Sequence, residues 1–185
     1  MKKFSLTALL CAAALALNGG ACAADLPKVG TPILITALGQ SQDANFVNLL
    51  AKRKKIETRY DLHIFAKDVN WSDYKTLFVV LGGSGKGLGA AGLDIPGEVK
   101  RSDELVAAAK KNGLQVVALH IGGEDRRGPN SEPFLGYAGL ADFAIVREDG
   151  NADGYFTKLC ESKKVPLLLI KKTSELTDML VEMTK

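Results

Sequence analysis

The sequence predicts a three-layer α/β fold, with helices on both faces of a mostly parallel sheet of five to six strands. Short apolar runs alternate along the chain with amphipathic helical patterns, as they do in parallel α/β proteins. The runs at 31–38 and 76–81 are apolar almost throughout, which is typical of parallel strands buried on both faces. No repeat, low-complexity tract or linker interrupts this alternation. We therefore expect a single α/β domain over residues 24–185.

The strands follow from the apolar runs taken in order. They are predicted at 31–38, 59–65, 76–81, 115–121, 142–146 and 165–170. The second is more polar than the others and is expected near an edge. Right-handed crossovers then place helices on both faces of the sheet. We expect the flavodoxin-like order 2-1-3-4-5 with strand six at the edge, and the alternative is a Rossmann-like order, because periodicity alone does not separate the two.

Helices are predicted between the strands from apolar spacing and capping residues. Asp43 is the expected cap of a helix that runs to about Lys55, with Phe46, Val47 and Leu50 at helical spacing. Further helices are expected over 98–111, after residue 131, over 154–164 and over 176–183.

The first 23 residues have the three parts of a secretory signal peptide. Lys2 and Lys3 are followed by an apolar run over 4–17 and then by Ala21-Cys22-Ala23. The apolar run is shorter than the roughly 20 residues of a membrane-spanning helix. We expect cleavage after Ala23 and a periplasmic protein. A lipid anchor on Cys22 is the less favoured alternative, because Gly19 stands where lipoprotein signals usually carry Leu.

Charge and cysteine content restrict the possible functions. The formal net charge is +3, and removal of Lys2 and Lys3 leaves +1. This balance provides no electrostatic basis for binding nucleic acid. Cys160 would be the one remaining thiol, and its place on a helical stripe predicts a buried apolar role. No metal site is expected because the chain lacks a spaced His/Cys ligand set, and no cofactor is expected either.

The candidate site lies beyond the carboxyl ends of the strands, where open α/β sheets bind ligands. Four loops leave the strands there, at 39–41, 82–92, 122–128 and 148–151. Helix N-termini, glycine-loop N–H groups and Arg or Lys side chains all favour an anion. The predicted ligand-binding residues are Gln40, Ser41, Ser84, Lys86, His120, Glu124, Arg126 and Arg127.

Two alternatives stay open for the 122–128 loop. Its acidic residues could pair with Arg126 and Arg127 instead of a ligand, or bind a metal with His120. His120 itself lies within a buried apolar strand, where a histidine is more often a satisfied core residue than a base.

The 82–92 loop matches nucleotide and hydrolase motifs only in part. Gly87 stands where a P-loop has the Ser or Thr that binds magnesium, and the GxGxxG match at 87–92 follows the third strand and leads to Pro96. Lys86 breaks the GxSxG pattern around Ser84. We expect a flexible glycine loop with one amine, suited to a carboxylate or phosphate.

As a set, these segments resemble a family of exported bacterial proteins catalogued only as a domain of unknown function. The resemblance lies in Thr31-Pro-Ile-Leu-Ile-Thr36 with Gly39-Gln-Ser41, in Lys86-Gly-Leu-Gly-Ala-Ala-Gly92 and in His120-Ile-Gly-Gly-Glu124. It spans nearly the whole chain after the signal and implies no activity.

The function expected from the sequence is an exported periplasmic protein that binds a small anionic molecule at the carboxyl edge of its sheet. One alternative is a periplasmic hydrolase that uses Ser84, or a water activated by His120 or Glu124. Another is an interaction module that serves a membrane transporter or envelope complex. Binding is favoured over catalysis, and we assign no catalytic residue.

Overall fold

Six parallel strands form one sheet in the order β2-β1-β3-β4-β5-β6. The computed structural model describes residues 26–185, and the predicted signal peptide, its cleavage site and Cys22 lie outside them. This order confirms the flavodoxin-like prediction, and the Rossmann-like alternative is wrong. The strands are β1 Ile33–Leu38, β2 Thr58–Tyr60, β3 Thr76–Leu81, β4 Gln115–His120, β5 Phe143–Arg147 and β6 Leu167–Ile170.

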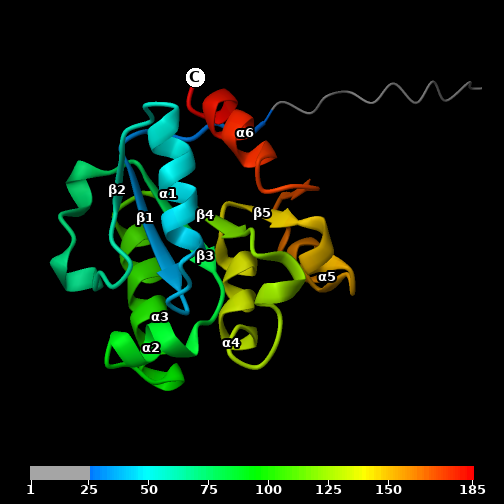
Figure 1. Cartoon of the computed structure of the whole chain (residues 1–185). Helices are drawn as coiled ribbons and strands as arrows, with labels where there is room; N and C mark the ends of the chain where they lie inside the picture. The colour runs from blue at the N-terminus through cyan, green and yellow to red at the C-terminus, as the bar shows by residue number, and fades with distance from the viewer. Residues whose placement is uncertain (1–25) are drawn as a thin grey trace, which may run out of the picture.

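Helices cover both faces of the sheet (Figure 1). Helix α1 (Asp43–Arg53) and helix α6 (Glu175–Met183) pack on one face, where their apolar residues join a cluster with Phe78 and Val117. The other face carries the longest helix and two shorter ones. These are α3 Ile95–Lys111, α4 Glu132–Leu135 and α5 Tyr155–Lys163. The sheet is therefore buried on both sides, which explains its uninterrupted apolar strands.

The remaining elements are short. Helix α2 (Gly85–Ala90) lies at the end of the molecule toward which the β1 arrow points (Figure 1). The 3-10 helices are η1 Ala66–Asp68, η2 Trp71–Asp73, η3 Gly123–Arg126, η4 Gly136–Leu140 and η5 Glu148–Asn151. Within residues 26–185, no helix combines the length and apolar character needed to span a bilayer.

The second strand is shorter than predicted. It ends at Tyr60, whereas the sequence suggested a strand from 59 to 65. The Asp61 carboxylate accepts a hydrogen bond from the His63 N–H at 3.1 Å, and such side-chain turns compete with the strand ladder. Leu62 and Ile64, the apolar residues that suggested a longer strand, are buried although they lie in a loop.

The glycine segment after β3 is a helix rather than the flexible loop that was expected. The Ser84 hydroxyl caps α2 by accepting a hydrogen bond from the Gly87 N–H at 3.1 Å. Helix α3 also begins earlier than expected, at Ile95, because Asp94 caps it through the Gly97 N–H. Both are side-chain caps of a helix N-terminus.

Helix α1 lies where it was predicted, but its cap residue, its last residue and the exposure of Phe46 differ from the prediction. Gln42, not Asp43, is the cap residue, and the helix ends at Arg53. Phe46 is 45% exposed although it shares helical spacing with buried Val47 and Leu50. The predicted burial of Cys160 is confirmed, since only 1% of this residue is exposed.

Candidate functional site

Two loops meet where the strand order reverses, between β1 and β3. Gln40 and Gly83 form an isolated bridge that joins the loop after β1 to the loop after β3. Gly39 has a φ of +103°, and a Cβ on it would lie 2.5 Å from the Gly82 carbonyl oxygen. Only glycine fits such an approach without displacing the backbone. The two loops are therefore held against each other at the carboxyl edge of the sheet.

Gln40 and Ser41 lie in this junction but do not face solvent. Both are 0% exposed. The Gln40 amide nitrogen donates to a Glu98 carboxylate oxygen at 2.9 Å, and the Ser41 hydroxyl accepts from the Asp43 N–H at 3.2 Å. In this conformation both side chains hold the turn after β1, and a ligand at the surface does not reach them.

A buried ion pair also holds the turn after β1. Glu98 and Arg101, one helical turn apart on α3, are 0% and 1% exposed, and the guanidinium makes two hydrogen bonds to the carboxylate at 2.6 and 2.7 Å. Glu98 also accepts from the Gly39 N–H at 2.8 Å. Arg101 in turn donates to the backbone oxygens of Ala37 and Ile64.

This buried pair was not predicted from the sequence. A Glu and an Arg three positions apart on an amphipathic helix usually lie on its solvated face. The one available signal was that Glu98 and Arg101 fall on the same stripe of α3 as the buried residues Leu105 and Ala109. That stripe would have placed their charges toward the core.

His120 is also buried, at the end of β4. Its Nδ1 lies 3.1 Å from the Leu81 oxygen and its Nε2 lies 3.2 Å from the Gly123 oxygen. The ring packs 5.0 Å from the Phe156 ring, centroid to centroid. Burial lowers the pKa of His120, and the nearby Arg127 charge lowers it further, whereas the two carbonyl contacts raise it. The ring therefore lies between β3, β4 and η3, with each ring nitrogen beside a backbone oxygen.

Four of the five remaining predicted residues surround a surface pocket of about 280 Å³. It lies between the start of α2 and the segment that joins η3 to α4, and we call it the rim pocket. The polar and charged side chains that line it are Ser84, Lys86, Asp125, Arg126, Arg127, Asn130 and Ser131. Four of the eight predicted ligand-binding residues, Ser84, Lys86, Arg126 and Arg127, therefore line one pocket.

Close backbone packing forms the base of the rim pocket. The Gly83 N–H donates to the Ser131 hydroxyl at 2.9 Å. A Cβ on Gly83 would lie 1.7 Å from the Asn130 carbonyl oxygen, a distance that real structures do not allow. The two walls of the pocket are therefore in direct contact beneath it.

Both arginines of the rim pocket are already paired with carboxylates. Arg126 Nε lies 3.0 Å from an Asp43 oxygen. Arg127 binds both oxygens of Asp153, at 2.9 and 3.1 Å, and also contacts Glu132 at 3.3 Å. The sequence had left open a pairing with the acids of the arginines' own loop, but these partners come from α1, α4 and the loop before α5.

The Arg127 contact changes the acidity of its partner. Hydrogen bonding from the guanidinium lowers the pKa of Asp153 from its usual 3.8 to about 2. Arg127 also donates to the Gly150 oxygen at 2.7 Å and lies over the Tyr155 ring, 5.3 Å from its centroid. Arg127 is thus a connector between the loops after β4 and β5 as well as a wall of the pocket.

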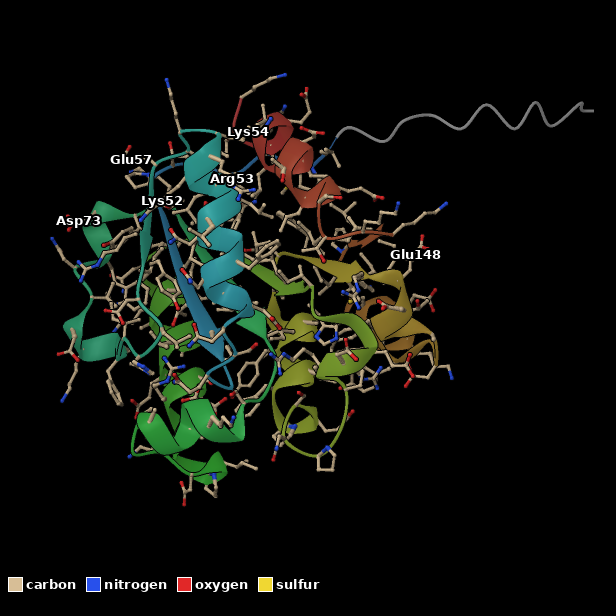
Figure 2. The ribbon with its side chains drawn as sticks, in the orientation of Figure 1. Lys52, Arg53, Lys54, Glu57, Asp73 and Glu148 are labelled. Atoms are coloured by element: carbon tan, nitrogen blue, oxygen red, sulfur yellow. The ribbon has the colours of Figure 1, made fainter. Side chains whose placement is uncertain are left out.

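Lys86 and Glu124 differ from the arginines because both side chains are exposed. Among residues 26–185, neither takes part in an ion pair. Lys86 lines the rim pocket, whereas Glu124 does not. Other cations of the chain lie elsewhere: Lys52, Arg53 and Lys54 are exposed near the far end of α1 (Figure 2).

Within the described residues, no hydrogen bond joins the Ser84 hydroxyl to a His, Asp or Glu side chain that could activate it as a nucleophile. The hydroxyl accepts the capping hydrogen bond of α2, while both ring nitrogens of His120 lie against backbone oxygens. Across residues 26–185, no three His, Cys, Asp or Glu side chains are grouped so as to hold a metal ion.

Comparisons with known proteins place the chain in a family. Residues 30–184 match the family described as "Domain of unknown function (DUF6305)". No curated protein matches. Among solved structures, a flavodoxin of Streptococcus pneumoniae TIGR4 is 13% identical, with 82% of this chain and 95% of that chain covered and a TM-score of 0.36. A flavodoxin from the domain Archaea is 12% identical, with 82% and 92% covered and a TM-score of 0.33.

The identities and TM-scores of these matches are too low to transfer any property to this chain, and the flavodoxin-like strand order rests on the sheet of this protein alone. The family match covers most of the chain, from just before β1 to the end of α6. The chain belongs to the DUF6305 family of domains of unknown function.

Proposed function

We propose that this protein is exported to the periplasm and binds a small anionic molecule in the rim pocket. The observation that carries the binding proposal is the meeting of three cationic side chains, Lys86, Arg126 and Arg127, around one hollow between the loops after β3 and β4. This hollow lies next to the reversal of strand order between β1 and β3, and open α/β sheets bind ligands beyond the carboxyl ends of their strands near that reversal. The volume of about 280 Å³ lies just below the range of about 300–1,000 Å³ for small-molecule sites, which favours a compact ligand.

The contacts are divided between exposed and supporting residues. Lys86 supplies the cation without a carboxylate partner, and the Gly85 and Lys86 N–H groups donate to no acceptor within residues 26–185. Within residues 26–185, Arg126 bonds only through its Nε and keeps both terminal guanidinium nitrogens unpaired. All three guanidinium nitrogens of Arg127 already bond to Glu132, Gly150 or Asp153, so Arg127 supplies charge and supports the wall. Gln40, Ser41 and His120 contribute by holding the turns behind the pocket, and Glu124 lies outside its lining.

The binding experiment has two stages. Native mass spectrometry of residues 24–185 first shows whether a small anion travels with the protein. Thermal unfolding is then followed with phosphate, sulfate, citrate and any molecule so identified. A ligand at a hundred times its Kd stabilises the native state by about 2.7 kcal/mol.

Variants assign the effect to the rim pocket. Lys86→Ala should abolish most of the stabilisation, and Arg126→Ala should weaken it, whereas Lys110→Ala, an exposed lysine on α3, is the matched control. Equal stabilisation of all three variants would rule out the rim pocket. Co-purification of a membrane partner without any small molecule would instead favour the interaction-module alternative.

Export has its own test. The full chain is expressed in a bacterial host, the periplasm is separated, and the mass of the protein is measured. We expect a product that begins at Ala24, because Ala21-Cys22-Ala23 fits a signal-peptidase site. A cytoplasmic protein that retains Met1 would contradict export. A membrane-bound product with an acylated Cys22 would instead support the lipid-anchor alternative and contradict cleavage after Ala23.

A further inference from the structure

The rim pocket contains one free charge of each sign. Lys86 and Asp125 both line it and are both exposed, and within residues 26–185 neither takes part in an ion pair. Arg126 and Arg127 differ from them, because each is paired with a carboxylate from another part of the chain. Once these ion pairs are set aside, one ammonium and one carboxylate remain around the same hollow.

The two free charges do not neutralise each other. Lys86 lies on α2 and Asp125 lies on η3, and no ion pair joins them across the described chain. A ligand in the hollow therefore has access to both. A ligand with negative charge alone satisfies Lys86 but lies against the Asp125 carboxylate, and like charges repel.

The cation nearest to competing for Asp125 is itself engaged. Asp125 also lines a second hollow of about 380 Å³, together with Arg147. Hydrogen bonding to Asp149 raises the pKa of Arg147, and the nearby Asp125 charge adds to the effect. The two Asp149 oxygens hold the Arg147 guanidinium, whereas no ion pair within residues 26–185 joins it to Asp125. The Asp125 carboxylate therefore remains open to a cationic group of a ligand.

We propose that the ligand of the rim pocket is an anion that also carries an ammonium group, as aminocarboxylates and aminophosphates do. This inference rests on the proposed function and names its class of ligand. The acidic group lies between Lys86 and the two unpaired terminal nitrogens of Arg126, and the ammonium donates to Asp125. Both contacts are hydrogen bonds between charged groups, which are stronger than those between neutral groups.

The test uses two pairs of probes that differ only in the ammonium group. Glutamate is compared with glutarate, and phosphoethanolamine with ethyl phosphate, by calorimetric titration of residues 24–185. Each amine-bearing probe should bind about tenfold more tightly than its partner, because it adds one hydrogen bond between charged groups. The pair that binds more tightly shows whether the acidic group is a carboxylate or a phosphate.

Variants assign the preference to Asp125. Asp125→Asn should remove the advantage of the amine-bearing probes and leave glutarate and ethyl phosphate bound at least as tightly as before. Glu124→Gln is the matched control, since this neighbouring carboxylate is also exposed but does not line the pocket. It should keep the full advantage, whereas Lys86→Ala should weaken all four probes.

The outcomes separate this inference from the proposed function. If phosphate or citrate binds through Lys86 but neither amine-bearing probe binds more tightly than its partner, the ammonium inference is wrong and the anion site stands. Equal losses in Asp125→Asn and Glu124→Gln would assign the preference to the general charge of the loop and would also overturn the inference. If no anion binds at all, the proposed function fails and the inference fails with it.

Discussion

The turn after β1 and the loop after β4 present similar polar side chains, but the structure uses them in opposite ways. Gln40 and Ser41 are sealed beneath the surface by Glu98 and Arg101. Arg126 and Arg127 instead remain partly exposed, with 35% and 19% of their side-chain surface accessible, in a pocket with room for a ligand. The difference shows that a polar residue at the carboxyl edge of the sheet is a ligand candidate only if its contacts within the protein leave its side chain accessible.

The largest expected effect is a loss of folding stability when the buried Glu98–Arg101 pair is broken. Glu98→Gln leaves the Arg101 guanidinium buried without its counter-charge, and loss of one partner of a buried pair typically costs about 3–5 kcal/mol. Urea unfolding measures the change. The control is Glu104→Gln, on the exposed face of the same helix, which should change stability by less than about 0.5 kcal/mol. Similar values for the two variants would show that the buried network contributes little.

A smaller effect is expected at the contact between the two walls of the rim pocket. Gly83→Ala places a methyl group 1.7 Å from the Asn130 oxygen, and such overpacking usually costs about 1–3 kcal/mol. Gly89→Ala on α2 has nothing within 4 Å and should stabilise the helix by up to about 1 kcal/mol. Thermal unfolding of both variants checks this pair. A Gly83→Ala protein as stable as wild type would mean that the walls separate readily.

The smallest effect concerns the exposed ion pair between Arg127 and Asp153. Hydrogen bonding lowers the pKa of Asp153 to about 2 from its usual 3.8. A lowered carboxyl pKa adds stability that is present above the unfolded value and is lost as the pH falls from about 4 to 2. Since the carboxylate is exposed, we expect less than about 1 kcal/mol. Carboxyl NMR titration should show the pKa return toward 3.8 in Arg127→Lys, and an unchanged pKa there would assign the shift to another cause.

Much of the fold was predictable because it depends on local pattern. Strands β1 and β3 were identified from continuous apolar runs, and right-handed crossovers predicted the helices on both faces of the sheet. The errors lie where local hydrogen bonds decided the outcome. The Asp61 carboxylate forms a side-chain turn where β2 ends, and the Ser84 hydroxyl caps a helix, α2, where a flexible glycine loop was expected.

The candidate site was only partly predictable, because burial and ion pairing depend on partners distant in sequence. The loops were assigned to one edge from their position after the strands, and Ser84, Lys86, Arg126 and Arg127 do line one pocket there. Nothing near Gln40 in sequence shows that Glu98, on a different element, binds it. The partner of Arg126 is likewise far away, on α1.

By itself the sequence determined the α/β class and the edge of the sheet at which a ligand is sought, since hydrophobic periodicity and chain chirality act over short distances. It favoured the flavodoxin-like strand order, but only the assembled sheet excluded the Rossmann-like one. The tertiary structure alone decided which polar residues of that edge are buried supports and which line a pocket. It also decided that β6 ends the sheet with an apolar edge unpaired within the described chain. The physical reason is that desolvation, ion pairing and exposed area depend on every element packed around a residue, and those neighbours are assembled only when the sheet forms.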